Sequence, residues 1–426
     1  MYVLLKKTLR ASSCFTLSIC CMLFITVGNK IAATDRWALV KVPSADLSAE
    51  RLSRFQGLPP FSYSTFPCAP DKGFSIGFRI HQLKFNELVK VQTCLKDEVE
   101  CEVQHFFYRG HDKKDYKTFW IDRKDLVFLK DLPPKEVLSS VPPPCRMSDF
   151  SYQCNKNVLT LISPWSDLRT RKTYSAGTRF MRCSAKDTKD RYAVFILDMS
   201  SFKSVVSYVP TPFALISYPQ KQFQARALFV QVLKEWAHNH NGIIPYVFGG
   251  CSHNGKIISR GFSIACGLRD DEKISYWHRN HIQSQPLSGF DCSSMILCAA
   301  QICGIPYFYK NSFTLYYYMK TLKENEKLQE GDLLWYSGHV MIVSDVKKNL
   351  LIEAAGYDTG YGKVHEISID KLFQGIKNYT ELIACCKRGN ELKRLHSKGH
   401  PYKSIENLKI LALKSLWDID LKTRKA

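Results

Sequence analysis

The feature that most constrains this chain is a cysteine just before an apolar segment, with a histidine downstream at the start of a β-rich segment. The cysteine is Cys292, within residues 289–294, and the histidine is His339, within residues 338–343. The residues after Cys292 have the spacing of a buried helix. Cys292 then lies in the first helical turn, where free N–H groups and the helix dipole favour a thiolate. The pattern predicts a Cys-His pair, and an unreactive buried cysteine is the alternative.

A third polar residue follows the histidine. Residues 340–344 and 350–354 read as two strands joined by a polar turn. This hairpin is expected to return Glu353 toward His339, where a carboxylate would orient the imidazole. The alternatives are a solvent-facing carboxylate for Glu353 and a structural strand residue for His339.

Four segments resemble, in the same order, motifs of the NlpC/P60 family of cell-wall cysteine peptidases. They are residues 245–250, 290–294, 330–333 and 338–340, which read PYVFGG, FDCSS, EGDL and GHV. The resemblance covers about residues 221–390. It implies a papain-like α+β domain that cleaves peptidoglycan stem peptides, commonly between D-glutamate and a diamino acid.

The resemblance also implies roles for individual residues. Cys292 is the expected nucleophile, His339 the general base and Glu353 the orienting residue, a position where many members have histidine. Asp291 is expected to bind the free amino group of the substrate together with Tyr246, and helix N-capping is the competing role for Asp291. The full set of residues expected to contact substrate is Asp291, Tyr246, Ser293 and Ser312. No cofactor is expected.

A long insertion separates the glycine pair from the cysteine motif. Residues 251–288 take the place of a short connection in the family, and their position predicts a lid or a wall of the substrate site. The segment holds five residues of zinc-binding type, but their spacing matches no strong zinc pattern, so no metal is expected. These residues are Cys251, His253, Cys266, His278 and His281.

The N-terminal half reads as small β-domains. Two proline-rich stretches, residues 131–144 and 208–219, separate short strand-like runs. Residues 119–127 and 173–180 resemble parts of the bacterial SH3-like barrels that often precede NlpC/P60 domains. We therefore predict an α+β protein with five parts. A signal peptide (residues 1–33) is followed by an N-terminal segment plus first barrel (34–140) and a second barrel (145–217). The catalytic domain (221–390) comes next, and a basic tail containing an amphipathic helix (391–426) follows it.

Charge and the N-terminal segment indicate an envelope protein. Residues 1–33 combine basic residues, an apolar run and small residues, as in a signal peptide, which predicts export to the periplasm or cell envelope. Lys and Arg number 60 against 39 Asp and Glu, a net charge of +21. That surplus favours an anionic wall or membrane surface, and without a nucleic-acid motif we expect no nucleic-acid partner.

The sequence therefore predicts an exported cysteine endopeptidase that acts on peptidoglycan or muropeptides. Two alternatives stay open. One is a catalytically silent protein that binds or scaffolds the cell wall. The other is a papain-like amidase or acyltransferase that uses the same residues on a different substrate.

Overall fold

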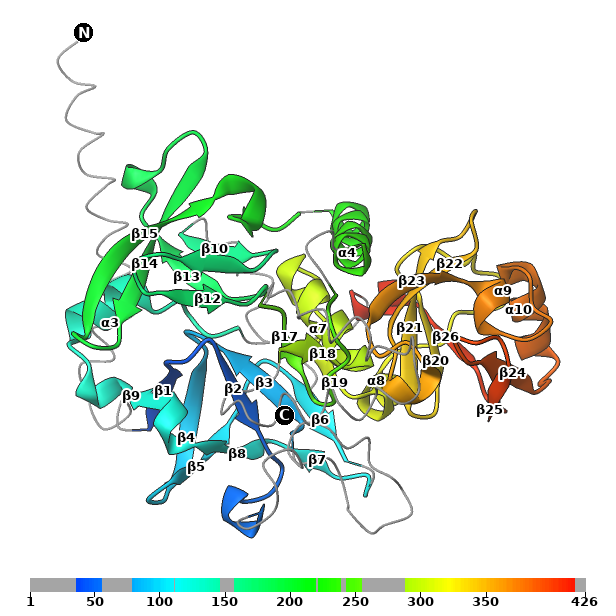
Figure 1. The fold of residues 1–426 in the computed structure, drawn as a ribbon, viewed down its shortest axis with the longest axis horizontal. Helices are drawn as coiled ribbons and strands as arrows, with labels where there is room; N and C mark the ends of the chain where they lie inside the picture. The colour runs from blue at the N-terminus through cyan, green and yellow to red at the C-terminus, as the bar shows by residue number, and fades with distance from the viewer. Residues whose placement is uncertain are drawn as a thin grey trace, which may run out of the picture.

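The computed structural model describes residues 36–55, 79–110, 112–145, 157–219, 221–238, 243–254 and 288–417. The expected signal peptide lies outside the described residues, as do residues 255–287 of the insertion, with Cys266, His278 and His281. Figure 1 shows two sheets from the N-terminal half, a central group of helices, and a third sheet formed by the C-terminal part of the chain.

The first sheet alternates apolar and polar residues along its strands, as a sheet with one buried face requires. Val99 and Cys101 of one strand and Phe119 and Ile121 of its neighbour are fully buried. All neighbouring strands are antiparallel, in the order β8 (Thr118–Asp122), β5 (Glu98–Glu102), β4 (Leu88–Cys94), β1 (Trp37–Val40) and β9 (Leu126–Phe128). A separate ribbon pairs β2 (Ser44–Leu47) with β3 (His81–Lys84).

The second sheet follows the first proline-rich stretch. It is also antiparallel, in the order β15 (Lys203–Pro210), β14 (Arg191–Asp198), β13 (Arg179–Arg182), β10 (Val158–Leu161) and β16 (Ala214–Leu215). Helix α3 (Pro134–Ser140) packs against β14 and β15, and a ribbon joins β11 (Trp165–Asp167) to β12 (Lys172–Tyr174). Trp165 stacks on Tyr174 inside this unit, with ring centroids 5.7 Å apart.

Neither N-terminal sheet closes into a barrel among the described residues. The first sheet has β8 and β9 as its edges, and the second has β15 and β16. The two sheets fall within residues 34–140 and 145–217, and SH3-like barrels for these segments stay a prediction.

The third sheet contains the expected hairpin. Its antiparallel order is β23 (Val364–Ser368), β22 (Leu350–Ala354), β21 (His339–Asp345), β20 (Leu333–Tyr336) and β26 (Lys409–Leu411). Ile342 pairs with Ile352, which confirms the predicted hairpin of β21 and β22. Because side chains alternate, Val340 faces one side of the sheet and His339 the other.

Helices cover both faces of this third sheet. Helices α4 (Gln222–Ala237) and α7 (Cys292–Ile302) pack on the face of Val340 and Ile342, and α8 (Ser312–Tyr318) lies beside β20. Helices α9 (Ile369–Leu372) and α10 (Tyr379–Lys387) contribute to the apolar cluster on the other face. Within the described part of the chain, none of the helices has the length and apolar character that crossing a membrane requires.

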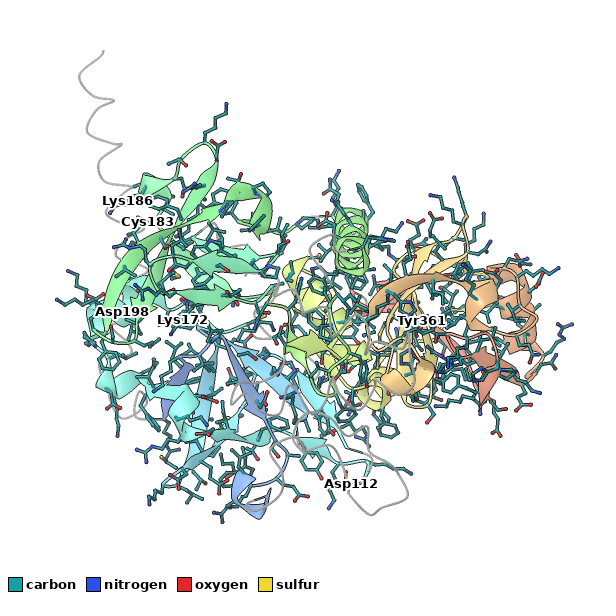
Figure 2. The ribbon with its side chains drawn as sticks, viewed as in Figure 1. Asp112, Lys172, Cys183, Lys186, Asp198 and Tyr361 are labelled. Atoms are coloured by element: carbon teal, nitrogen blue, oxygen red, sulfur yellow. The ribbon has the colours of Figure 1, made fainter. Side chains whose placement is uncertain are left out.

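Of residues 391–426, which we predicted to be a basic tail, the described part, residues 391–417, belongs to the C-terminal fold. They form the hairpin of β24 (Leu392–Leu395) and β25 (Pro401–Ile405), and β26 completes the third sheet beside β20. The expected amphipathic helix is wrong, because Lys409–Leu411 is a strand and only Leu413–Leu416 is helical, as a short 3-10 turn. Figure 2 shows the side chains on this C-terminal unit, where Tyr361 is labelled.

The N-terminal half is joined directly to the elements around Cys292. Strand β6 (Phe107–Arg109), which also pairs with β7 (Asp115–Tyr116), runs parallel to β19 (Tyr309–Lys310). The side chain of Gln82 in β3 accepts hydrogen bonds from the backbone of Cys251 and the hydroxyl of Ser252. The start of α7 is therefore supported from both halves of the chain.

Candidate active site

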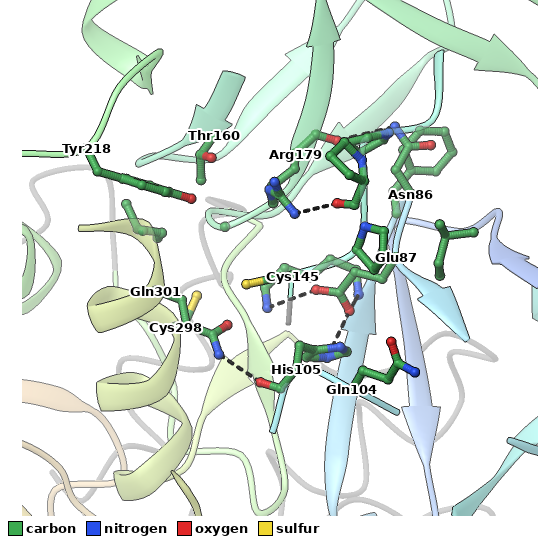
Figure 3. A pocket seen from close by; sticks show the side chains of 18 residues that line it. Asn86, Glu87, Gln104, His105, Cys145, Thr160, Arg179, Tyr218, Cys298 and Gln301 are labelled. Atoms are coloured by element: carbon green, nitrogen blue, oxygen red, sulfur yellow. Dashed lines mark hydrogen bonds and ion pairs between the residues drawn. The ribbon is translucent and has the colours of Figure 1, made fainter. Parts of the chain in front are cut away.

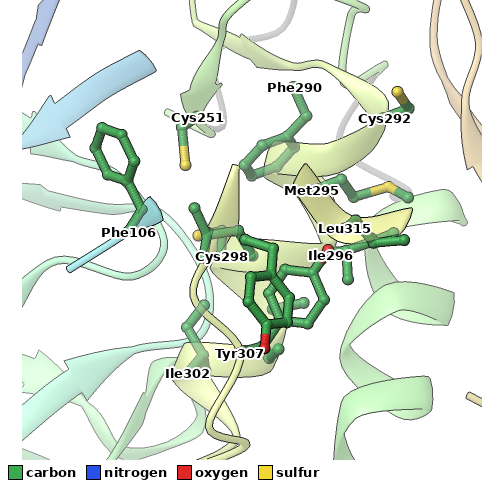
Figure 4. Close-up of a cluster of buried hydrophobic side chains, with 14 of the residues drawn as sticks. Phe106, Cys251, Phe290, Cys292, Met295, Ile296, Cys298, Ile302, Tyr307 and Leu315 are labelled. Carbon is green, nitrogen blue, oxygen red and sulfur yellow. The ribbon is translucent and has the colours of Figure 1, made fainter. Parts of the chain in front are cut away.

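Cys292 is the first residue of α7, as the sequence predicted. Asp291 has the extended backbone of an N-cap, with φ −84° and ψ 171°, and its carboxylate accepts the N–H of Ser294 at 2.6 Å. A short ribbon fixes the preceding residues, because β17 (Cys251–Ser252) pairs with β18 (Gly289–Phe290). Figure 4 shows Cys292 at the end of the helix, above the apolar cluster that contains Phe290.

The thiol of Cys292 lies in surroundings that disfavour its ionisation. The residue is 7% exposed, and burial raises the pKa of the thiol to about 12, with the carboxylate of Asp291 adding to the shift. Hydrogen bonds from the N–H groups of Val340 and Ser293, and the charge of Lys310, lower the pKa of Cys292 by less. Cys292 is therefore a neutral thiol at neutral pH.

His339 begins β21 directly after a tight turn. It pairs with Tyr336 of β20 across a two-residue loop in which Gly338 has a φ of 88°, a conformation that glycine adopts without strain. The Nε2 atom of His339 lies 2.6 Å from Oε2 of Glu353. Burial lowers the pKa of His339, and the hydrogen bond to Glu353 opposes that shift only in part.

Glu353 is fully buried and bound by more groups than the sequence indicated. Two hydrogen bonds of 2.7 Å run from one guanidinium nitrogen of Arg394 to its two carboxylate oxygens, and His365 Nε2 lies 3.1 Å from Oε1. Arg394 also donates to the hydroxyl of Tyr336 at 2.7 Å. Burial alone would raise the pKa of Glu353, but Arg394 and the two histidines hold it well below its usual range. Glu353 therefore stays a carboxylate.

The thiol and the imidazole lie on opposite faces of the third sheet. Helix α7 lies on the Val340 face, and the Cys292 sulfur meets the N–H of Val340. His339 faces the other way, toward Glu353, and its described side-chain hydrogen bond goes to that carboxylate. The Nδ1 atom is the ring nitrogen not bonded to Glu353. Catalytic hydrogen bonds are often long or poorly aligned before substrate binds, so the expected Cys-His pair stays a prediction.

The carboxylate of Asp291 already has a cationic partner. Lys310 Nζ lies 2.5 Å from Asp291 Oδ2 and also donates to the hydroxyl of Ser294, and Lys310 is buried. Ser293 donates to Asp291 Oδ1 at 2.8 Å and accepts the N–H of Asn311 at 3.1 Å. The N-cap role of Asp291 is confirmed. Its expected role in binding a substrate amine stays a prediction, and Lys310 would compete for the same carboxylate.

The remaining two predicted residues lie in elements next to the start of α7. The N–H of Tyr246 donates to the carbonyl of Gly362 at 2.9 Å, and its backbone bridges to Phe290, which precedes Asp291 in β18. Ser312 is the first residue of α8, and its carbonyl accepts the indole N–H of Trp335 at 2.7 Å. Both residues are brought near the site, while their contact with substrate stays a prediction.

The residues of zinc-binding type do not assemble into a site in the part of the chain that is described. No group of three or more His, Cys, Asp or Glu side chains there has an arrangement that could hold a metal ion. Instead, Cys251 lies in the core, and His253 packs near the rings of Trp236 and Phe290.

Three residues around the site were missed by the sequence analysis: Arg394, His365 and Lys310. Arg394 comes from a hairpin that we had assigned to the tail, and Lys310 follows α7 in a segment without a family motif. His365 was detectable in principle, because it occupies a strand after Glu353 and pairs with it across β22 and β23. Tyr361 lies against His365, with ring centroids 4.2 Å apart.

Comparison with known proteins places this chain beside NlpC/P60 structures at low similarity. No family model and no curated protein matches it. An NlpC/P60 family protein from Bacillus cereus ATCC 10987 is similar at 14% identity and a TM-score of 0.48, covering 81% of this chain and 96% of that one. NlpC2 from Trichomonas vaginalis is 9% identical with a TM-score of 0.29, and the match covers 87% of this chain and 98% of that one. NlpC1 from the same organism is also 9% identical with a TM-score of 0.30, and the match covers 79% of this chain and 88% of that one.

Proposed function

We propose that this chain is a cysteine peptidase of the NlpC/P60 type that hydrolyses peptidoglycan stem peptides, at the bond between γ-D-glutamate and a diamino acid. The observation that carries the proposal is Cys292 at the first position of α7, with its sulfur at the N–H of Val340. The residue before Val340 is His339, which a buried carboxylate holds at 2.6 Å. The order of the four sequence motifs supports the substrate class. Export to the envelope, and SH3-like folds for the two N-terminal units, belong to the same proposal.

The chemistry follows from the protonation states. Cys292 and His339 are both neutral at rest, so a proton must move from Sγ to Nδ1 as the sulfur attacks the scissile carbonyl. Glu353 supports this transfer, because its charge stabilises the imidazolium that forms. His339 then returns the proton to the departing amine, and water releases the acyl group from Cys292.

Negative charge on the carbonyl oxygen develops at the start of α7. The N–H of Cys292 occupies the first helical position, where backbone donors have no partner within the helix. Such a donor, together with the helix dipole, stabilises the oxyanion of the tetrahedral intermediate. The same helix end that carries the nucleophile therefore supplies the oxyanion contact.

Incubation of the purified chain with muropeptides tests this function. We expect mass spectrometry to show tripeptide and tetrapeptide stems cut at the γ-D-glutamyl bond. The Cys292→Ala variant should be inactive, while Cys303→Ala, at the other end of the same helix, should retain cleavage. Cleavage that persists in Cys292→Ala would exclude the assigned nucleophile.

A wall-binding protein without peptidase activity is the alternative that the raised pKa of Cys292 favours. A thiol that does not ionise and makes no hydrogen bond to His339 is a weak nucleophile until substrate rearranges the site. The two functions separate when iodoacetamide labelling of Cys292 is measured with and without muropeptides. Labelling that stays slow in both conditions, with muropeptides bound but uncut, would favour the binding protein. The amidase or acyltransferase reading would require turnover of other acyl substrates and none of muropeptides.

A further inference from the structure

A second group of reactive residues lies behind the active site, where a buried ammonium meets two thiols. Lys84 of β3 is 4% exposed, and its Nζ lies 3.6 Å from the sulfur of Cys251. Cys251 in turn hydrogen-bonds with Cys298, which lies six positions after Cys292 in α7. Both cysteines are free thiols, and Figure 4 shows Cys251 above Cys298 at the edge of the apolar cluster. Neither has a part in the proposed hydrolysis.

The surrounding backbone holds the three side chains together. Gly177 has a φ of 84°, and a Cβ atom there would lie 3.0 Å from the Cys298 sulfur and 3.0 Å from Cε of Lys84. The sulfur of Cys298 lies 3.7 Å from the carbonyl oxygen of Ala176, and the sulfur of Cys251 lies 3.8 Å from that of Ser294. The thiols are therefore held by contacts from β17, α7 and the turn before β13.

A small cavity reaches this group at Lys84 and Cys298. It lies between α7 and the N-terminal sheets, has a volume of about 40 Å³, and is lined by residues that include Lys84, Cys298 and Gln301 (Figure 3). A water molecule needs roughly 10–15 Å³ by the same measure, so a molecule the size of hydrogen peroxide fits.

The charges around the pair distinguish its two members. Burial would raise the pKa of Cys251, but the hydrogen bond from Cys298 and the ammonium of Lys84 bring it down to about 7. The pKa of Cys298 is raised, first by that same hydrogen bond and then by burial. Lys310 and Glu87 are the other charged groups that act on Cys251, and they act in opposite directions. Cys251 is thus the thiolate and Cys298 its proton donor.

We propose that Cys251 and Cys298 form a dithiol–disulfide couple that hydrogen peroxide oxidises. The Cys251 thiolate attacks one peroxide oxygen, the O–O bond breaks, and a sulfenic acid and hydroxide result. The sulfur of Cys298 then attacks the Cys251 sulfur, a disulfide forms, and the sulfenic oxygen leaves as water once it takes the Cys298 proton. Each sulfur gives up one electron, and one peroxide is reduced to two waters.

The disulfide would tie the two elements that flank the nucleophile. Cys251 starts β17, whose partner β18 leads into Asp291, and Cys298 lies in the body of α7. The bond would close residues 251–298, including the insertion, into one covalent loop. Its formation does not require Cys292 to be a nucleophile, so the couple and the peptidase activity can fail independently.

Peptide mapping of the full chain tests the couple. The Cys292→Ala variant removes the active-site thiol, and the protein is treated with hydrogen peroxide, alkylated with iodoacetamide and digested. We expect a cross-linked peptide pair containing Cys251 and Cys298, lighter by two hydrogens and separated again by dithiothreitol. Oxidation of Cys251 to sulfinic acid without a cross-link, or preferential linkage to Cys303, would overturn the proposal.

Whether Lys84 promotes ionisation of Cys251 is tested by the pH dependence and the rate of cross-linking. In the parent chain, cross-linking should be half-maximal near pH 7, whereas an unassisted thiol would require about pH 8.5. Lys84→Met should slow cross-linking at pH 7 by roughly fivefold or more, because less Cys251 is ionised. Lys90→Met, which removes a partly exposed lysine of the neighbouring strand β4, should leave the rate unchanged. A half-maximal pH near 8.5 in the parent would refute assistance by Lys84 even if the variant failed to fold.

Discussion

The start of α7 and the neighbouring ribbon of β17 each hold a buried cysteine, and their surroundings shift the two thiols in opposite directions. Cys292 lies next to the carboxylate of Asp291, and its pKa rises to about 12. Cys251 has the ammonium of Lys84 at 3.6 Å, and its pKa falls to about 7. Both residues are almost fully buried, so burial does not separate them. The groups around them do: Asp291 adds to the rise at Cys292, whereas a hydrogen bond from Cys298 and then the charge of Lys84 lower the pKa of Cys251.

This difference suits different chemistry at the two places. A thiol that ionises only when substrate brings His339 into contact is protected from oxidation between turnovers. A thiol that is ionised at rest reacts with small oxidants without a substrate. Lys310 could have made Cys292 resemble Cys251, but its ammonium is bound to Asp291 and Ser294.

The largest expected effect separates the two cysteines by function. Cys292→Ser should lower muropeptide cleavage on the order of 10⁴-fold or more, because a serine hydroxyl in this site is a much weaker nucleophile than a thiol. Cys251→Ser should leave the rate of cleavage nearly unchanged. Initial rates measured by chromatography check both variants. Equal losses in the two would contradict the division of roles.

The two buried cations Arg394 and Lys84 can be compared by how much the free energy of unfolding falls when each is removed. Arg394→Met leaves the charge of Glu353 in the interior without its cation, which should cost about 3–5 kcal/mol in the free energy of unfolding. Lys84→Met should cost less, because the thiols beside it can simply stay protonated. Urea unfolding at pH 7 measures both. Arg394→Met combined with Glu353→Gln should recover part of the loss, and a lack of recovery would show that the ion pair is not its cause.

The loss of stability caused by Arg394→Met should depend on pH in a defined direction. The pKa of Glu353 is lower in the folded chain than in the unfolded chain, so the stability it confers is present above about pH 4.5. It is lost as the pH falls through the lower, folded pKa. The difference between the parent and Arg394→Met should therefore shrink in strong acid.

The sequence was sufficient for features that depend on neighbouring residues. The helix starting at Cys292, its Asp291 cap and the hairpin carrying His339 and Glu353 follow from apolar periodicity, capping chemistry and a polar turn, all of which act over a few residues. Arg394 could not be found this way. It is basic, it lies in a segment rich in lysine, and its burial depends on the β24–β25 hairpin reaching Glu353 across 41 positions.

The same limit applies to Lys310 and to the edge of the third sheet. Lys310 neutralises Asp291 from β19, whose position depends on pairing with β6 of the N-terminal half. Strand β26 completes the third sheet from residues that we read as a helix, because three strand residues followed by a short turn have apolar spacing similar to that of a helix. Tertiary pairing, rather than local preference, decided both.

Acidification should lower the folding stability of both regions, because each contains a buried neutral histidine. The loss should be larger on the side of β17. Burial lowers the pKa of His253 to about 3, and the pKa of His339 is also lowered. Since the unfolded chain binds protons first, the stability from each histidine is present above about pH 6.5 and is lost as the pH falls. For His253 the loss is about 1.4 kcal/mol at pH 5.5. His253→Gln should reduce the fall in Tm between pH 7.5 and 5.5. His238→Gln, at an exposed position, should not.

The smallest expected effect comes from removing the charge that separates the two thiols. Asp291→Asn keeps an N-cap, because asparagine caps a helix as well as aspartate does, so α7 should be retained. The negative charge that raises the pKa of Cys292 is lost, and Lys310 keeps its charge nearby. Alkylation of Cys292 by iodoacetamide at pH 8 should therefore become roughly threefold faster or more, since one pKa unit changes the thiolate fraction tenfold.

Two controls make that result specific. Ser293→Ala removes a neutral hydrogen bond to the same carboxylate and should leave the alkylation rate close to that of the parent. Cleavage of peptides with free and acetylated N-termini is measured on the same Asp291→Asn protein. A selective loss with free amines would show that a substrate ammonium displaces Lys310 from Asp291. Equal rates for both peptides would leave Asp291 as a cap and as the charge that keeps Cys292 protonated. An unchanged alkylation rate would mean that burial dominates the Cys292 pKa, and the contrast with Cys251 would then rest on the groups around Cys251, chiefly Cys298 and Lys84.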